Sequence, residues 1–376
     1  MFRGTQTPQE WARFDYLLIL IALALVAYGL ILIHSGSTES GEGLKISLNS
    51  PAIRQGIFAI ASLVAMILIS RLDYHALLHY AWWIYGITLF VLLLLLIIGQ
   101  TDFGSTRWFD LGVFQLQPSE FAKLSLIIIL ARLISDRGGD VKNIKTLLFT
   151  LLLSIPPLFL VFIQPDLGTS IIFITIWIGL VLVAGATRRH LVILGAFFLA
   201  LIPFVWTFGV EDYQIERISV VLNAEEDPLD SGYNPIQAQI AIGSGGLLGK
   251  GLFEGEQTQL NFLKVPTKDF IFSVLGEELG FLGAIILLGL FLLLLWRIIR
   301  SAQFAGDTSG QLLSVGIVTM ILFQLFINVA VNLGIFPVTG LPLPFVSAGG
   351  SSLLTLFISL GIVQSVVIHH RAYRQN

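Results

Sequence analysis

The sequence contains no cysteine and little charge. Because there is no cysteine among its 376 residues, a disulfide framework, a thiolate metal site and a cysteine nucleophile are all excluded. Charged residues make up 12% of the chain and hydrophobic residues 55%, whereas an ordinary soluble domain has about 25% and about 45–50%. A chain with so few charges cannot cover its surface for water, which excludes a soluble globular domain.

Long basic runs are missing as well. The net charge at pH 7 is −3 and no cluster of lysine and arginine is long enough to follow a phosphate backbone, which excludes nucleic acid as a partner. The first ten residues are polar, and no cleavage-site pattern follows the first apolar block. We therefore predict that this block is a retained membrane span and not a removable signal peptide.

Apolar runs of membrane-spanning length are abundant instead. A helix needs about 20 apolar residues to cross a hydrocarbon core about 30 Å thick. Such runs recur from end to end and predict an all-α integral membrane protein of about ten transmembrane helices, built as one polytopic membrane domain over residues 1–376. The predicted helices cover 16–34, 52–70, 76–98, 118–134, 146–163, 168–186, 190–207, 269–299, 312–334 and 349–369.

Lysine and arginine predict the orientation of these helices. An even number of spans puts both termini on one side, and cytoplasmic loops carry an excess of basic residues. With both termini in the cytoplasm, thirteen basic residues fall in inside segments and eight outside, and half of those eight lie in one long loop. We expect this loop, residues 209–268 between the seventh and eighth helices, to be extracytoplasmic. Its glycine-rich part, Ile242–Gly251, is compatible with a re-entrant or interfacial segment.

Ionisable residues close to the apolar runs are the first candidates for chemistry, since each costs ~2.5–3.5 kcal/mol at the centre of a span. Arg107 and Trp108 precede a predicted helix that starts near Pro118, and Glu120 and Lys123 lie three residues apart on one face of that helix. The pair fits a functional cavity. It equally fits an interfacial salt bridge, with Trp108 as a membrane-belt anchor.

Carboxylates also stand near the predicted outer surface. Asp166 is placed to cap the helix that follows it, and we assign it no chemistry. Asp269 lies where the long loop enters a span, where it fits either a cap or a catalytic group. Glu277 and Glu278 come two turns later, so at least one of them should face a polar interior or a partner.

The last candidate segment, residues 332–352, holds three prolines and four glycines between two spans. Irregular backbone at membrane depth is tolerated only where it is buried in protein or lines a wet cavity. This pattern is typical of a channel, a transporter or the floor of an active site, and does not choose between them. No internal repeat is evident, which weakens an inverted-repeat transporter.

These segments, in this order and spacing, resemble the SEDS family of bacterial cell-wall polymerases, the group that contains RodA, FtsW and SpoVE. The resemblance covers nearly the whole chain, and two of its motifs are more similar to RodA than to FtsW. Two departures stand out: Lys268 occupies a position that is usually threonine in the family, and Ala348 one that is commonly tyrosine. The motifs are Gln164–Thr169, Asp227–Tyr233, Gln237–Gly246, Asp269–Phe272 and Pro337–Pro344, of which the first and last are the RodA-like ones.

The resemblance implies a peptidoglycan glycosyltransferase of the bacterial cytoplasmic membrane that polymerises lipid II into β-1,4 glycan strands for cell elongation and shape. It implies that Asp269 is the essential carboxylate. Arg107, Trp108, Glu120 and Lys123 would line the polar cavity that leads to it. The implied partners are lipid II, the nascent glycan strand, membrane lipid and a class B penicillin-binding protein that crosslinks the strands.

One carboxylate suffices for this reaction because pyrophosphate leaves as a stable anion, whereas a glycosidase commonly needs two carboxylates. The departing charge needs cations, for which Arg107, Lys123, Arg217 and Lys268 or a divalent Mg or Mn ion are candidates. If the side chains of Lys268 and Asp269 converge, we expect a lowered pKa at Asp269. The main alternative is a lipid II flippase, which should place charged groups on both faces, and a pure scaffold is a third hypothesis.

Overall fold

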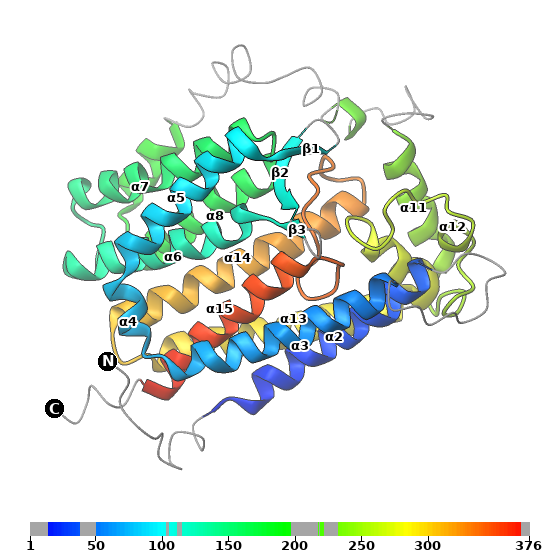
Figure 1. Cartoon of the computed structure of the whole chain (residues 1–376), viewed down its shortest axis with the longest axis horizontal. Helices are drawn as coiled ribbons and strands as arrows, with labels where there is room; N and C mark the ends of the chain where they lie inside the picture. The colour runs from blue at the N-terminus through cyan, green and yellow to red at the C-terminus, as the bar shows by residue number, and fades with distance from the viewer. Residues whose placement is uncertain are drawn as a thin grey trace.

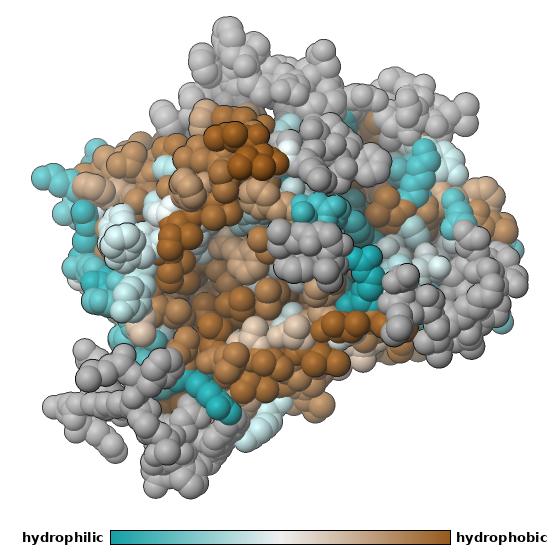
Figure 2. Space-filling model, in the orientation of Figure 1, coloured by the Kyte–Doolittle hydropathy of each residue, from teal (hydrophilic) through white to brown (hydrophobic). Residues whose placement is uncertain are grey.

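The computed structural model describes residues 14–37, 50–102, 105–110, 115–196, 217, 219–221 and 232–369. Long helices lie side by side in it, and a small sheet and two further helices stand at one end (Figure 1). Figure 2 shows hydrophobic side chains over the middle of the visible face, with hydrophilic ones toward its two ends. The long helices are α2 (Tyr16–Gly36), α3 (Pro51–Arg71), α5 (Ala81–Ile98), α6 (Pro118–Asp136), α7 (Ile144–Ile163), α8 (Leu167–Val183), α13 (Ile271–Phe304), α14 (Thr308–Asn332) and α15 (Gly350–His369).

The prediction of a helical multi-pass membrane protein is confirmed. Of the helices in the described residues, seven are long and apolar enough to cross a membrane: α2, α3, α5, α7, α13, α14 and α15. Helix α8 is a shorter apolar helix, and α6 is almost entirely buried between its neighbours. Nine predicted spans coincide with these helices. The remaining one, 190–207, is helical over residues 190–196, and the rest of it lies outside the described residues.

One predicted boundary needs correction, and one segment contains strands that were not expected from the sequence. The span predicted at 76–98 is two helices, α4 (Tyr74–His79) and α5, because the chain leaves helical geometry at Tyr80. The segment between α5 and α6 is not plain loop. It forms a three-stranded antiparallel sheet of β1 (Gln100–Asp102), β2 (Ser105–Asp110) and β3 (Gln115–Leu116). These strands are too short to produce an alternating pattern that a sequence reading would detect.

The two ends of the bundle are fixed by polar contacts between α2 and α13. At one end, the Arg297 guanidinium pairs with the Asp15 carboxylate at 2.6 Å. At the other end, the Ser35 hydroxyl donates to the Glu278 carboxylate. We call these the Arg297 end and the Asp269 end. About 20 residues of α2 separate them, which matches the ~30 Å of a bilayer core.

A second polar cluster closes the Arg297 end. His75 of α4 lies 2.8 Å from the Asp73 carboxylate and 3.1 Å from that of Asp307, which caps α14. Hydrogen bonds to Asp307 and Asp73 raise the pKa of His75 to about 9, so its imidazole is cationic at neutral pH. The cluster therefore ties the start of α4 to the start of α14 through opposite charges.

Helix α13 is broken at Gly280, whose φ is +63°. The glycine loop, residues 246–251, follows α11 (Tyr233–Gly245) and pairs with the two sides of this break. Its amides at Lys250 and Gly251 donate to the carbonyls of Glu277 and Glu278, and its carbonyls at Gly246 and Leu247 accept from the amides of Phe281 and Leu282. A Cβ at Gly280 would overlap the backbone of this loop, so only glycine permits the approach.

The expectation that at least one of Glu277 and Glu278 faces a polar interior is confirmed, since both are buried in protein. The fully buried Glu277 carboxylate accepts from the amide of Gln257 at 2.9 Å, from the amide and hydroxyl of Thr258 at 3.1 and 2.9 Å, and from Lys250 Nζ at 3.2 Å. It thereby holds the short helix α12 (Glu256–Gln259) against α13. Glu277 is a structural residue that organises the segment preceding Asp269.

Candidate active site around Asp269

Asp269 lies just ahead of α13 at the Asp269 end of the bundle. The N-cap position of α13 is Phe270, and no side chain makes a capping hydrogen bond there. The carboxylate of Asp269 is therefore not used as a helix cap, which was the competing interpretation of this residue. It is partly exposed, whereas Phe270 beside it is buried in the core.

Two amide side chains of α14 hold the main chain of Asp269. Asn328 Nδ2 donates to the Asp269 carbonyl at 3.1 Å, and Asn332 Nδ2 donates to the same carbonyl at 2.9 Å. Asn332 Oδ1 accepts from the amide and hydroxyl of Ser273, at 3.0 and 2.7 Å. Both asparagines are buried, so these bonds are sheltered from exchange with water. Their effect is to fix where the Asp269 backbone enters α13.

The same amides attach the proline- and glycine-rich segment to this point. Asn328 Nδ2 also donates to the carbonyl of Leu341, at 2.9 Å. The neighbouring residue, Gly340, has a φ of +71°, and a Cβ there would lie 3.6 Å from Arg107 Nη1 and 3.9 Å from Asp269 Oδ2. Gly340 thus lies close to both the guanidinium and the carboxylate. The irregular backbone predicted for residues 332–352 is confirmed, and it forms the floor of the site.

Arg107 reaches the site from β2. Its side chain donates to the carbonyls of Gln164 and Pro165, in the turn between α7 and α8. Asp166, in the same turn, accepts from the amide of Thr169 at 3.1 Å and from its hydroxyl at 2.9 Å. The prediction that Asp166 caps a helix is confirmed, and its carboxylate is occupied by that role.

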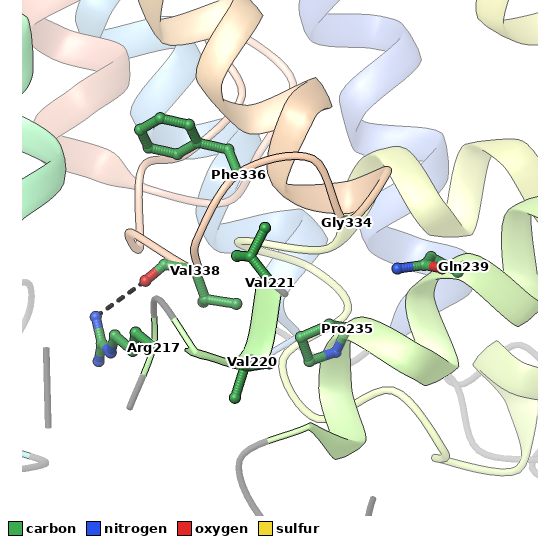
Figure 3. A pocket seen from close by; sticks show the side chains of 8 residues that line it. All are labelled: Arg217, Val220, Val221, Pro235, Gln239, Gly334, Phe336 and Val338. Atoms are coloured by element: carbon green, nitrogen blue, oxygen red, sulfur yellow. Dashed lines mark hydrogen bonds between the residues drawn. The ribbon is translucent and has the colours of Figure 1, made fainter. Parts of the chain in front are cut away.

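Arg217 approaches from a described stretch of the long loop. Its Nη1 donates to the carbonyl of Val338 at 3.1 Å (Figure 3). It lines a small, mostly apolar pocket of about 40 Å³. Gln239 of α11 lies on the far side of this pocket, against Gly334, where any Cβ would overlap the Gln239 amide. Arg217 therefore holds the floor segment at Val338, whereas Asn328 holds it at Leu341.

Lys268 is exposed, and its main chain is held in place. The Ser347 hydroxyl donates to the Lys268 carbonyl at 2.5 Å, and the amide of Ala348 donates to the Thr267 carbonyl at 2.9 Å. Ala348, one of the two departures from the family pattern, thus contributes only its backbone to these bonds. The segment before Asp269 and the segment before α15 are joined directly.

Burial and charge act in opposite directions on Asp269. Burial raises the pKa of the Asp269 carboxyl, and the charges of Lys268, Arg107 and Arg217 lower it. The negative charge of Asp166 raises it further, and the net pKa lies above the ordinary value. The expected lowering by Lys268 is present and is the largest of the lowering influences, but the net direction is upward. The reason is that loss of hydration outweighs three cations.

The other predicted site residues make no described contact with Asp269. Lys123 Nζ and Glu120 Oε1 form an ion pair at 2.7 Å, with side chains 0% and 2% exposed. The predicted pairing is confirmed, but it lies inside the helix bundle, and no described contact joins it to Asp269. Trp108, on β2 beside Arg107, is partly buried. That Trp108, Glu120 and Lys123 contact substrate stays a prediction.

A divalent cation finds no protein cage in the described part of the chain. No group of three or more His, Cys, Asp and Glu side chains is placed there to hold a metal ion. Asp269 is surrounded by cationic side chains and Asp166 is engaged by Thr169, a donor set that does not fit a hard cation. The metal ion therefore stays a prediction, and no residue is assigned to it.

Sequence reasoning assigned no role to Asn328 and Asn332, although a signal was present. Gln324, Asn328 and Asn332 recur every four residues in an otherwise apolar helix. Side chains four residues apart lie on one helix face, and amides are costly there unless they find partners.

The arrangement as a whole offers one carboxylate at the rim, three cations beside it and a rigid backbone beneath. This arrangement suits removal of a proton next to a departing anion.

Comparison with known proteins identifies the family. The family model described as cell cycle protein, for FtsW, RodA and SpoVE, matches residues 15–372. The chain belongs to this family. It is 39% identical to stage V sporulation protein E of Bacillus subtilis, covering 95% of this chain and 98% of the relative. It is 38% identical to the peptidoglycan glycosyltransferase MrdB of Escherichia coli, covering 95% and 94%.

Solved structures agree with this assignment. A chain from a peptidoglycan synthase complex, reported to coordinate polymerization and crosslinking, is 33% identical with a TM-score of 0.80, covering 96% of this chain and 99% of that one. The crystal structure of Thermus thermophilus RodA, a rod shape determining protein, is 31% identical with a TM-score of 0.71, covering 96% and 98%. The shared fold extends over the whole membrane domain.

The buried ion pair yields a test of stability. Lys123→Met alone leaves the Glu120 carboxylate buried without its partner, so we expect a loss of about 3–5 kcal/mol in the free energy of unfolding. The double variant Glu120→Gln/Lys123→Met should lose less than the single one. Thermal unfolding in detergent compares the two. A double variant that is less stable than Lys123→Met would contradict the pairing.

Proposed function

We propose that this protein is a peptidoglycan glycosyltransferase that polymerises lipid II into β-1,4 glycan strands at the outer face of the bacterial cytoplasmic membrane. Family membership and the printed activity of the Escherichia coli relative support the reaction class. The observation that carries the proposal is Asp269, a carboxylate free of capping duty and set beside Arg107, Arg217 and Lys268. The RodA-like motifs support a role in elongation and cell shape.

In the proposed reaction, the 4-hydroxyl of an incoming GlcNAc attacks the anomeric carbon of the growing strand. A new C–O bond forms on one face as the bond to undecaprenyl pyrophosphate breaks on the other, which inverts the configuration. Asp269 accepts the hydroxyl proton. A raised pKa suits this task because a base works best when its pKa lies near the operating pH.

The electron pair of the broken bond leaves with the pyrophosphate, which needs no proton. Arg107, Arg217 and Lys268 act on Asp269 electrostatically, so an anion that departs near this carboxylate enters the same positive field. Arg107 and Arg217 are each held by backbone carbonyls, which keeps their charges in place before the reaction. Such preorganised charge is usually the largest catalytic contribution of a protein.

The excess of basic residues in the inside segments supports cytoplasmic termini, which puts the Asp269 end outside. There, lipid II presents its sugars and pyrophosphate. The structural relative that comes from a synthase complex is reported to coordinate polymerization with crosslinking. On that basis we propose a class B penicillin-binding protein as the partner of this chain.

Replacing the proposed base provides the direct test. Asp269→Asn keeps the size of the side chain and removes its proton affinity, so we expect polymerisation of fluorescent lipid II by the purified protein to fall at least 100-fold. Unfolding temperature serves as the folding control. Near-normal glycan output from Asp269→Asn would overturn the mechanism, and transfer of lipid II across liposomes without polymer from the parent protein would favour the flippase.

The amides beneath Asp269 generate a second prediction. Asn332→Asp replaces the donor that faces the Asp269 carbonyl by a carboxylate oxygen that repels it, while the acceptor for Ser273 is kept. We expect kcat to fall about 100-fold, as for a misplaced catalytic group, with KM for lipid II changed by less than about threefold.

The matched control is Ser273→Ala, which removes one hydrogen bond to Asn332 Oδ1 and leaves both amide bonds to Asp269. Its kcat should stay within about threefold of the parent. Equal losses in the two variants would mean that Asn332 only stabilises the fold.

The acid limb of the activity profile reports on Lys268. Because Asp269 must be deprotonated, activity is present above its pKa and is lost as pH falls through it. Lys268 lowers this pKa, so Lys268→Thr should move the acid limb to higher pH by about one unit or less. The test is the polymerisation rate of the variant and the parent as a function of pH, measured at low and high salt. Superimposable profiles for variant and parent at low salt would show that Lys268 does not act on the base.

A further inference from the structure

The glycine loop carries two of the most exposed apolar side chains in the described part of the chain. Leu247 is 73% exposed and Leu248 is 78% exposed. They follow α11 directly and precede Lys250, whose charge is paired with Glu277 at 3.2 Å. Two adjacent leucines that are this exposed are costly in water.

The contacts of the glycine loop with α13 show how far the loop extends along the membrane-spanning length of that helix. The Ser35–Glu278 contact marks the Asp269 end of the membrane-spanning length, and the Tyr28 hydroxyl meets the carbonyl of Gly283 farther in. The carbonyl of Leu247 accepts from the amide of Leu282, four residues beyond Glu278. The loop carbonyl therefore meets α13 beyond the break at Gly280, on the side of Glu278 that leads toward Gly283.

Several polar groups of the loop backbone have the protein partners that entry into hydrocarbon requires. The amides of Gly249, Lys250 and Gly251 all donate to backbone carbonyls, and the carbonyls of Gly246 and Leu247 accept from α13. The break at Gly280 supplies these partners, since it frees the α13 amides that the loop carbonyls take up.

The exposed leucines also continue an existing apolar surface. Phe281, Leu282, Ile285 and Ile286 of α13 are each about half exposed, and α13 is one of the membrane-spanning helices. The loop and this face of α13 are joined by hydrogen bonds between adjacent backbones. The surface that lipid covers on α13 therefore extends onto the loop without a polar boundary.

We propose that the glycine loop is re-entrant and that Leu247 and Leu248 contact lipid acyl chains in the leaflet at the Asp269 end. The occupant of this surface is the bilayer itself. The loop anchors α11, whose last residue, Gly245, lies so close to the Gly276 carbonyl that a Cβ would overlap it. Because α11 also carries Gln239, this anchor stabilises the wall of the pocket beside Arg217.

The absence of cysteine makes the test simple. Leu247→Cys and Leu248→Cys are labelled with an environment-sensitive nitrobenzoxadiazole dye and reconstituted in liposomes of phosphatidylcholine and phosphatidylglycerol. We expect emission shifted to the blue, protection from aqueous iodide, and stronger quenching by lipids with a doxyl group near the headgroup than by lipids with one near the methyl end. Having two labelled positions guards against one label that perturbs the fold.

Two control positions calibrate the signal. Leu292 is 67% exposed in the middle of α13 and should report deep lipid. Glu256, whose side chain is 75% exposed on α12, should report water. Iodide quenching at 247 and 248 equal to that at 256 would overturn the proposal. So would protection from both iodide and doxyl lipids, because that result means a protein, such as a second copy of this chain, covers the loop. Neither readout depends on polymerisation, so the result stands apart from the proposed activity.

Discussion

The hydrogen bonds from Asn328 and Asn332 to the carbonyl of Asp269 are the contact on which the rest of the site depends. They join α14 to the start of α13, and Asn328 extends the connection to Leu341 in the floor segment. Because both amides are buried, a lost bond would leave an unsatisfied polar group inside the protein. Three segments that are distant in sequence are thereby held at one point.

Burial and charge act in opposite directions at that point, and burial is the larger influence. Burial alone would keep Asp269 protonated, and cations alone would make it a weak base. Arg107 and Arg217 are each fixed to a backbone carbonyl, whereas Lys268 is exposed. The two arginines therefore set a permanent field, and the lysine adds a contribution that salt screens. The positive φ of Gly340, +71°, lets the floor segment turn beside Arg107 and Asp269.

The sequence by itself determined the membrane fold, and its resemblance to the SEDS family singled out Asp269 as the candidate base. Apolar runs of spanning length place nine helices in the described residues within a few positions of where they lie, because hydrocarbon thickness dictates helix length. The four charged or proline-rich segments stood out because polar groups at membrane depth need a reason. The Glu120–Lys123 pair followed from helical spacing alone.

Only the tertiary structure decided what these residues do for one another. Whether Asp269 caps a helix depends on the local geometry of Phe270, and its pKa depends on burial that no spacing reveals. The break at Gly280 depends on the glycine loop, which lies about thirty residues earlier in the chain. This loop forms hydrogen bonds with the backbone groups of α13 that are left without helical partners at the break. Local sequence pattern determines the secondary-structure elements. The geometry of the site depends on close approach between distant backbones, and this approach is possible only where the side chains are small enough.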